Sequence, residues 1–185
     1  MPARRRPGEG GAAPMRPGLF SRRGSALIET AIWTPLLVLF FMGAVEFGRA
    51  TYTYYTLKKI LYNIARYAGT QSGVNFCDPG DQTLEAVKLM ALTGNVEGSG
   101  ERILPGLEPD QISLRIERYT PETESLAECS CEASATGCDA AQGARGPDYI
   151  VASVPEGYPF RIRLGGIIGE PILFRAQIKV PYGGL

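Results

Sequence analysis

One apolar run sets the limits on what this chain can fold into. Ala31–Val45 holds 15 residues without a charged side chain. A bilayer core needs about 20 helical residues, and the wider stretch Ser25–Gly48 has 24 residues, or about 36 Å of helix. Glu29 and Glu46 lie near the two ends of this wider stretch. We therefore predict one membrane-spanning helix near the start of the chain.

Charge is distributed unevenly around this run. Residues 1–24 carry six arginines and one glutamate, a net charge of +5, whereas residues 25–185 carry 13 basic and 18 acidic side chains, a net charge of −5. A basic segment before a membrane helix stays in the cytoplasm, and one with so little apolar content does not fold. We predict a disordered leader (1–24), a transmembrane and stem helix (25–69) and a periplasmic domain (70–185). The net negative charge of residues 25–185 argues against a nucleic-acid partner.

The chain has no histidine. Ser-His-Asp and Cys-His catalysis and His-ligated metal sites are therefore excluded. The remaining candidates for acid–base chemistry are two acidic pairs, Glu122/Glu124 and Glu128/Glu132, in a polar loop without sign of a pocket. We expect no enzyme activity, no cofactor and no metal.

A short motif precedes the apolar run. Arg22–Glu29 (RRGSALIE) places a glycine before small and apolar residues, with a glutamate at the fifth position after it. This motif resembles the processing site of type IV prepilins and pseudopilins. The resemblance implies cleavage between Gly24 and Ser25 by a prepilin peptidase, and pairing of Glu29 with the new α-amino group of a neighbouring subunit, which sets subunit register. Without such a partner, a carboxylate in the hydrocarbon costs about 2.5–3.5 kcal/mol on insertion scales.

Three further segments, together with this motif, make the resemblance more specific. The motif at 24–29, PLLVLF at 35–40, VEFGR at 45–49 and ARYA at 65–68 together resemble the TadE-like family, minor pilin-like proteins of tight-adherence (Flp) pilus assembly. The resemblance covers about residues 22–70. It implies a structural inner-membrane or pilus-base protein without enzyme activity, whose partners are the prepilin peptidase, other pilin or pseudopilin subunits and the pilus assembly machinery.

Alternatives stay open at this point. A conventional cleaved signal needs a small-x-small site after the apolar core, and the chain there offers only Gly43, Ala44 and Gly48 before a charged continuation. An uncleaved, signal-anchored periplasmic interaction domain would keep its leader and tolerate loss of Glu29. A pseudopilin of a related secretion system would share the processing and differ in its partners.

The stem helix is expected to continue past the membrane. Pro35 predicts a helix kink, because proline removes one helical hydrogen bond. Beyond residue 50, one apolar stripe follows the helical period; we favour packing in the chain's own domain over packing against neighbouring subunits. Its members are Leu57, Ile60, Leu61, Ile64, Ala65 and Ala68. Gly69 is a stop signal.

The sequence after residue 70 predicts a second helix and four strands. Asp81–Thr93 predicts a helix whose apolar face is formed by Leu84, Val87, Leu89, Met90 and Leu92. Alternating or dense apolar runs predict strands at Ile112–Glu117, Tyr149–Val154, Tyr158–Leu164 and Phe174–Val180. The predicted fold class is α+β, with a long N-terminal transmembrane helix (a pilin-like stem), one short helix and an antiparallel sheet.

Four cysteines follow the predicted span: Cys77, Cys129, Cys131 and Cys138. Outside the cytoplasm such thiols oxidise, so we predict two disulfides. We expect Cys77 to pair with Cys129 or Cys131, and Cys138 to pair with whichever of these remains. A zinc site is the alternative, but the usual C-x2-C pairs are missing.

Overall fold

The computed structural model describes residues 22–71, 74–78, 80–121, 124–129, 138, 146–163 and 170–183. The chain divides into two compact units, Met1–Phe41 and Met42–Leu185. Most of the predicted leader, residues 1–21, lies outside the described residues. The first helix ends at Ala68, and the second compact unit begins at Met42. The predicted division into leader, stem helix and periplasmic domain stays a prediction.

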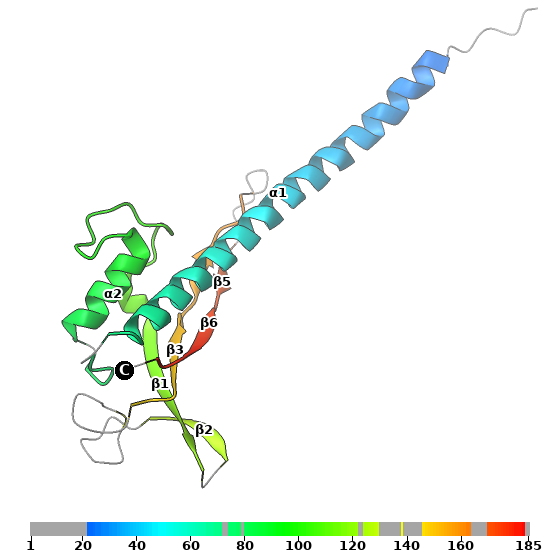
Figure 1. Ribbon diagram of the computed structural model, residues 1–185. Helices are drawn as coiled ribbons and strands as arrows, with labels where there is room; N and C mark the ends of the chain where they lie inside the picture. Colours follow the sequence, from blue (N-terminus) through cyan, green and yellow to red (C-terminus); the bar gives the residue numbers. More distant parts are fainter. Residues whose placement is uncertain are drawn as a thin grey trace, which may run out of the picture. The chain divides into compact units, whose positions relative to one another are not determined.

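Helix α1 spans Arg22–Ala68 and passes from the first unit into the second (Figure 1). In the first unit its described side chains are all exposed, including Leu27, Trp33 and Phe40. An exposed apolar surface on this scale is not tolerated in water and marks a contact with membrane or protein. Among the described residues, one helix, Ala26–Ala68, is long and apolar enough to cross a membrane.

In the second unit, α1 supplies one side of a hydrophobic core. The predicted apolar stripe is buried, with all six side chains at most 2% exposed. The stripe joins one cluster with residues of the second helix and the sheet, such as Leu84 and Ile150. The interpretation of the stripe as domain core is therefore confirmed.

Helix α2 (Gln82–Thr93) has a cap at each end. The Asp81 carboxylate accepts hydrogen bonds from the backbone N–H groups of Thr83 and Leu84, at 2.8 and 3.0 Å. Burial raises the pKa of Asp81, but these hydrogen bonds, with one from the Asn75 N–H, together hold that pKa below its usual value. Gly94 ends α2 in the left-handed conformation, as glycine readily does. The prediction of this helix is confirmed, and the capping signals explain its bounds.

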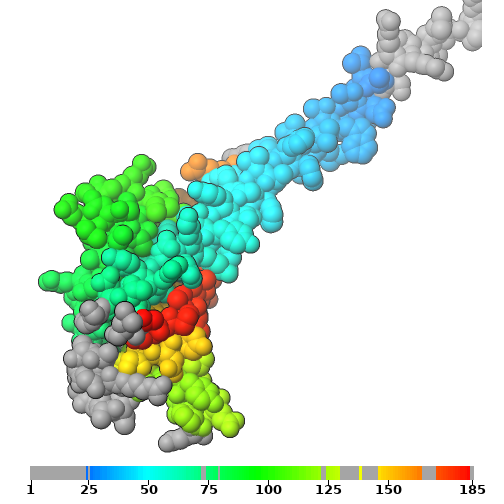
Figure 2. All heavy atoms as spheres, in the orientation of Figure 1, coloured from blue at the N-terminus to red at the C-terminus, as the bar shows by residue number. Residues whose placement is uncertain are grey.

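Four strands form an antiparallel sheet in the order β2-β1-β3-β6. They are β1 (Ser113–Thr120), β2 (Ser125–Glu128), β3 (Tyr149–Ser153) and β6 (Gln177–Pro181). Ile116, Ile150 and Val180 are paired across neighbouring strands and are all buried, so they form one row of the core. Figure 2 shows β6 (red) beside β3 (yellow) on the surface below α1.

Gly69 shows how closely α1 approaches this sheet. A Cβ at this position would lie 3.1 Å from Cδ1 of Ile150 in β3 and 3.3 Å from the carbonyl oxygen of Ala65. A side chain at this position would make a tight contact with Ile150 and require its side chain to move by a few tenths of an ångström.

A second, two-stranded sheet pairs β4 (Tyr158–Phe160) with β5 (Ile172–Phe174). Two strand predictions need correction here. Tyr158–Leu164 is a strand only as far as Phe160. Phe174–Val180 is two strands in different sheets, because the chain changes sheet at Arg175–Ala176, where the Val154 N–H donates to the Ala176 carbonyl.

Two further elements were not predicted. A 3-10 helix, η1, covers Pro109–Gln111 before β1. Strand β2 lies in the segment that we expected to be a polar loop, and its four residues are all exposed. An exposed edge strand has no apolar alternation, which is the signal that sequence reasoning uses.

Candidate functional site

The predicted processing site lies at the start of α1. Gly24 and Ser25 are the third and fourth residues of this helix, and Gly24 is exposed. A Cβ at Gly24 would meet no atom within 4 Å. Gly24 therefore lies in the first described turn of α1, with no side chain between its backbone and the surroundings.

Glu29 lies on α1 in the first unit and is exposed. No ion pair of Glu29 occurs among the side chains that the structure describes. The carboxylate is therefore available to a cation from outside these side chains. A helix bearing such a carboxylate in an apolar environment gains most from a partner that brings a positive charge.

Two threonines and a proline follow within α1. The hydroxyl of Thr30 donates to the Ala26 carbonyl at 2.8 Å, and the hydroxyl of Thr34 donates to the Thr30 carbonyl at 2.7 Å. These bonds satisfy both hydroxyls within the helix, which suits an apolar surrounding. Pro35 lies inside α1 and has no N–H for the carbonyl of Ala31. The predicted kink at Pro35 stays a prediction.

The VEFGR segment carries an ion pair in the second unit. Nη1 of Arg49 lies 2.7 Å from both carboxylate oxygens of Glu46, whose side chain is only 14% exposed. The Arg49 guanidinium also lies over the Phe160 ring of β4, 5.6 Å from its centroid. The i,i+3 spacing on one helix face predicts the ion pair, but nothing in the sequence indicated the contact with Phe160.

An aromatic cluster extends this contact along α1. Phe160 stacks on Phe174 of β5 with centroids 5.2 Å apart, and Phe174 meets the Tyr54 ring edge-on at 5.9 Å. The two-stranded sheet is thus fixed against α1 between residues 49 and 54. Sequence reasoning assigned Phe160 and Phe174 to predicted strands without bringing them together with Tyr54.

Disulfide bonding is present in the second unit. Cys129 is bonded to Cys138, with Cα atoms 5.7 Å apart, which is one of the two pairings expected for Cys138. Cys77 is also disulfide-bonded, and Cys131 lies outside the described residues. No group of three metal-binding side chains occurs among the residues that the structure describes.

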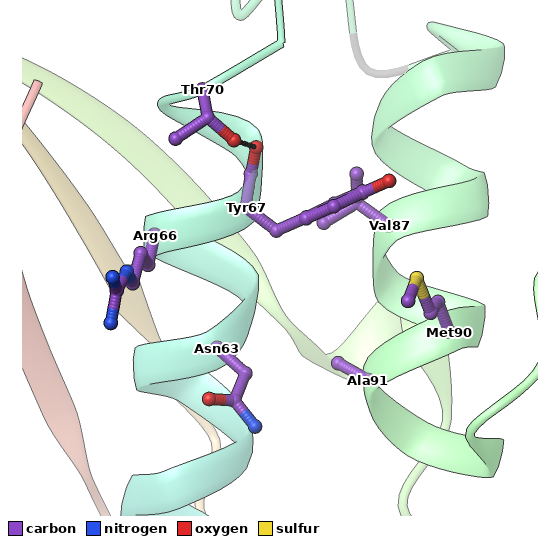
Figure 3. A pocket seen from close by; sticks show the side chains of 7 residues that line it. All are labelled: Asn63, Arg66, Tyr67, Thr70, Val87, Met90 and Ala91. Carbon is purple, nitrogen blue, oxygen red and sulfur yellow. Dashed lines mark hydrogen bonds between the residues drawn. The ribbon is translucent and has the colours of Figure 1, made fainter. Parts of the chain in front are cut away.

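A cleft of about 290 Å³ separates α1 from α2 (Figure 3). It is lined by Asn63, Arg66, Tyr67, Thr70, Val87, Met90 and Ala91. Met90, which we placed on the apolar face of α2, is 39% exposed. Its side chain lines the cleft. The residues described in this lining include no carboxylate and no thiol, so none of them is a general base that works near neutral pH.

The acidic pairs considered for catalysis are not brought together in the described part of the chain. Glu124 sits in the turn between β1 and β2 with a φ of 47°. Glu128 lies on β2, where a carboxylate oxygen is 3.6 Å from Nη1 of Arg115. Glu122 and Glu132 lie outside the described residues.

Comparison with known proteins identifies one family. A family model described as TadE-like protein matches residues 24–66, which is 43 of the 185 residues. No curated protein and no solved structure matches the chain. The matched range runs from Gly24 through Glu29, Pro35 and the VEFGR segment to Arg66. The resemblance seen in the sequence is therefore confirmed: residues 24–66 carry the pattern of the TadE-like family.

Proposed function

We propose that this chain is a structural, pilin-like membrane protein that takes part in assembly of a tight-adherence pilus and has no enzyme activity. The observation that carries the proposal is the coincidence of the TadE-like match at residues 24–66 with α1, whose N-terminal part is apolar and exposed. In this proposal, α1 anchors the chain in the inner membrane as a single span. The second unit is then held in the periplasm, where its disulfides are stable.

The proposal includes cleavage after Gly24 by a prepilin peptidase. The exposure of Gly24 in the first described turn of α1 supports it, because no side chain covers the backbone at this position. Gly24→Leu is expected to block cleavage, since its side chain would keep the backbone away from the catalytic carboxylates. Gly18→Leu, in the preceding segment, is the matched control and should be cleaved normally. Equal cleavage of both variants would contradict the assignment of Gly24.

Glu29 is proposed to pair with the α-amino group of a neighbouring processed subunit. The exposed carboxylate four residues after Ser25 supports this role. In cells that assemble the pilus, Glu29→Ala should reduce recovery of this chain with other pilin subunits after cross-linking, while Glu29→Asp retains part of it. Glu46→Ala is the control, because Glu46 is already paired with Arg49. Full assembly with Glu29→Ala would favour the alternative of an uncleaved, signal-anchored interaction domain.

A further inference from the structure

The two-stranded sheet β4–β5 occupies a defined place along α1. Arg49 lies over Phe160, and Tyr54 contacts Phe174. In the register of this sheet, Phe174 pairs with Tyr158, and Phe160 pairs with Ile172. The pair Tyr158–Phe174 therefore lies at the level of Tyr54, and the pair Phe160–Ile172 lies at the level of Arg49. From Tyr158 to Phe160, strand β4 thus runs toward the N-terminus of α1.

The residues that follow β4 therefore extend toward Val45 of α1, where the apolar run ends. An extended segment advances about 3.3 Å per residue, so Arg163 can reach about 10 Å beyond Phe160. The same distance spans about six or seven residues of helix, which is the level of Met42–Val45 in α1. The apolar run ends at Val45. The segment Arg161–Arg163 therefore lies near the depth at which α1 leaves the membrane under the proposed function.

The composition of this sheet differs from that of the rest of the second unit. Residues 158–176 carry three arginines and one glutamate, whereas the other residues of 42–185 carry 10 basic and 16 acidic side chains. Arg161 and Arg163 are exposed. Three aliphatic side chains beside them are also exposed: Ile162 (38%), Ile172 (47%) and Leu173 (48%). Exposed aliphatic groups interleaved with arginines are typical of segments that lie in a membrane interface.

We infer that the β4–β5 sheet rests on the periplasmic surface of the membrane that α1 spans, and binds anionic phospholipid headgroups. Arg161 and Arg163 contact lipid phosphates, and Ile162, Ile172 and Leu173 enter the headgroup layer. The contacts of Phe160 with Arg49 and Phe174 hold the sheet in this position. The inference rests on the proposed function only for the membrane anchoring of α1, and not for pilus assembly.

Hydrogen exchange on the full chain in lipid nanodiscs tests this inference. Amides of residues 158–163 and 170–176 should exchange about tenfold or more slowly in nanodiscs with 30% phosphatidylglycerol than in pure phosphatidylcholine, since each arginine contributes roughly fivefold at an anionic surface. Arg161→Glu with Arg163→Glu should abolish the difference. Exchange in β3 serves as the internal measure that the domain stays folded.

Lys59→Glu with Arg66→Glu is the matched control. It changes the charge by the same amount, on exposed positions of α1 well past the sheet, and should leave the lipid effect intact. An equal loss in both double variants, or no lipid effect in the unmodified chain, would overturn the inference. A chain that does not enter nanodiscs at all would overturn the anchoring as well, whereas insertion without slowed exchange would overturn the inference alone.

Discussion

Replacing Leu61 by alanine tests whether α1 is both anchor and core. Leu61 has no exposed surface and belongs to the core cluster. The substitution removes three carbon atoms, which at about 0.8 kcal/mol per buried methylene is about 2.4 kcal/mol. The cavity left behind raises the expected loss of unfolding free energy to about 3–4 kcal/mol. Leu39→Ala is the matched control on the same helix, because Leu39 is 64% exposed and lies in the first unit.

Urea titration of the full chain in detergent micelles measures both variants, with near-UV circular dichroism as the signal. The packed rings of Tyr54 and Tyr182 report on the second unit. The single tryptophan, Trp33, lies in the first unit and does not. Leu39→Ala should change the unfolding free energy by less than about 0.5 kcal/mol. A loss below about 1 kcal/mol for Leu61→Ala, or equal losses for both variants, would refute the reasoning.

Three further predictions concern the stability of the second unit. Asp81→Ala should lower the unfolding free energy by about 1 kcal/mol at pH 7 and Asp81→Asn by less. Folding lowers the pKa of Asp81 below its usual value of 3.8, so the stabilisation by its charge is present above pH 3.8 and is lost as the pH falls through the lower folded-state pKa. Urea titrations at pH 7 and at a series of values below pH 3.8 check this, and a pH-independent effect would contradict it. Gly69→Ala should lower the melting temperature, because the added methyl group contacts Ile150. Gly94→Ala should lower it through backbone strain alone. An unchanged melting temperature for Gly69→Ala would contradict the close approach of α1 to β3. Removing the disulfide with Cys129→Ser and Cys138→Ser should cost about 2–3 kcal/mol, and a smaller loss than about 1 kcal/mol in urea would show that the disulfide does not constrain the unfolded chain.

Much of the fold follows from local patterns in the sequence. The apolar period of α1 after residue 50 predicts its buried stripe, and Asp81 with Gly94 predicts the ends of α2. The dense run at Tyr149–Ser153 predicts the central strand β3, whose residues after Tyr149 are all buried. These signals are strong because each depends on neighbours within a few turns or one strand.

The parts that were missed depend on contacts distant in sequence. The alternation from Phe174 to Val180 is continuous, yet the chain changes sheets at Arg175–Ala176, since Phe174 packs on Tyr54 and Phe160. Met90 fits the apolar period of α2 but faces a cleft. At the site, the ion pair of Glu46 with Arg49 is local and was predictable, whereas the arginine's contact with Phe160 spans 111 residues of sequence and was not.

The intact mass and N-terminal sequence of the membrane-fraction protein show whether the chain is cleaved after Gly24. The protein would be produced with and without a prepilin peptidase. We expect a chain that begins at Ser25 when the peptidase is present and at Met1 when it is absent. A chain that begins at Met1 in both samples would contradict the claim, and with it the pairing of Glu29 with a neighbouring subunit's amino group.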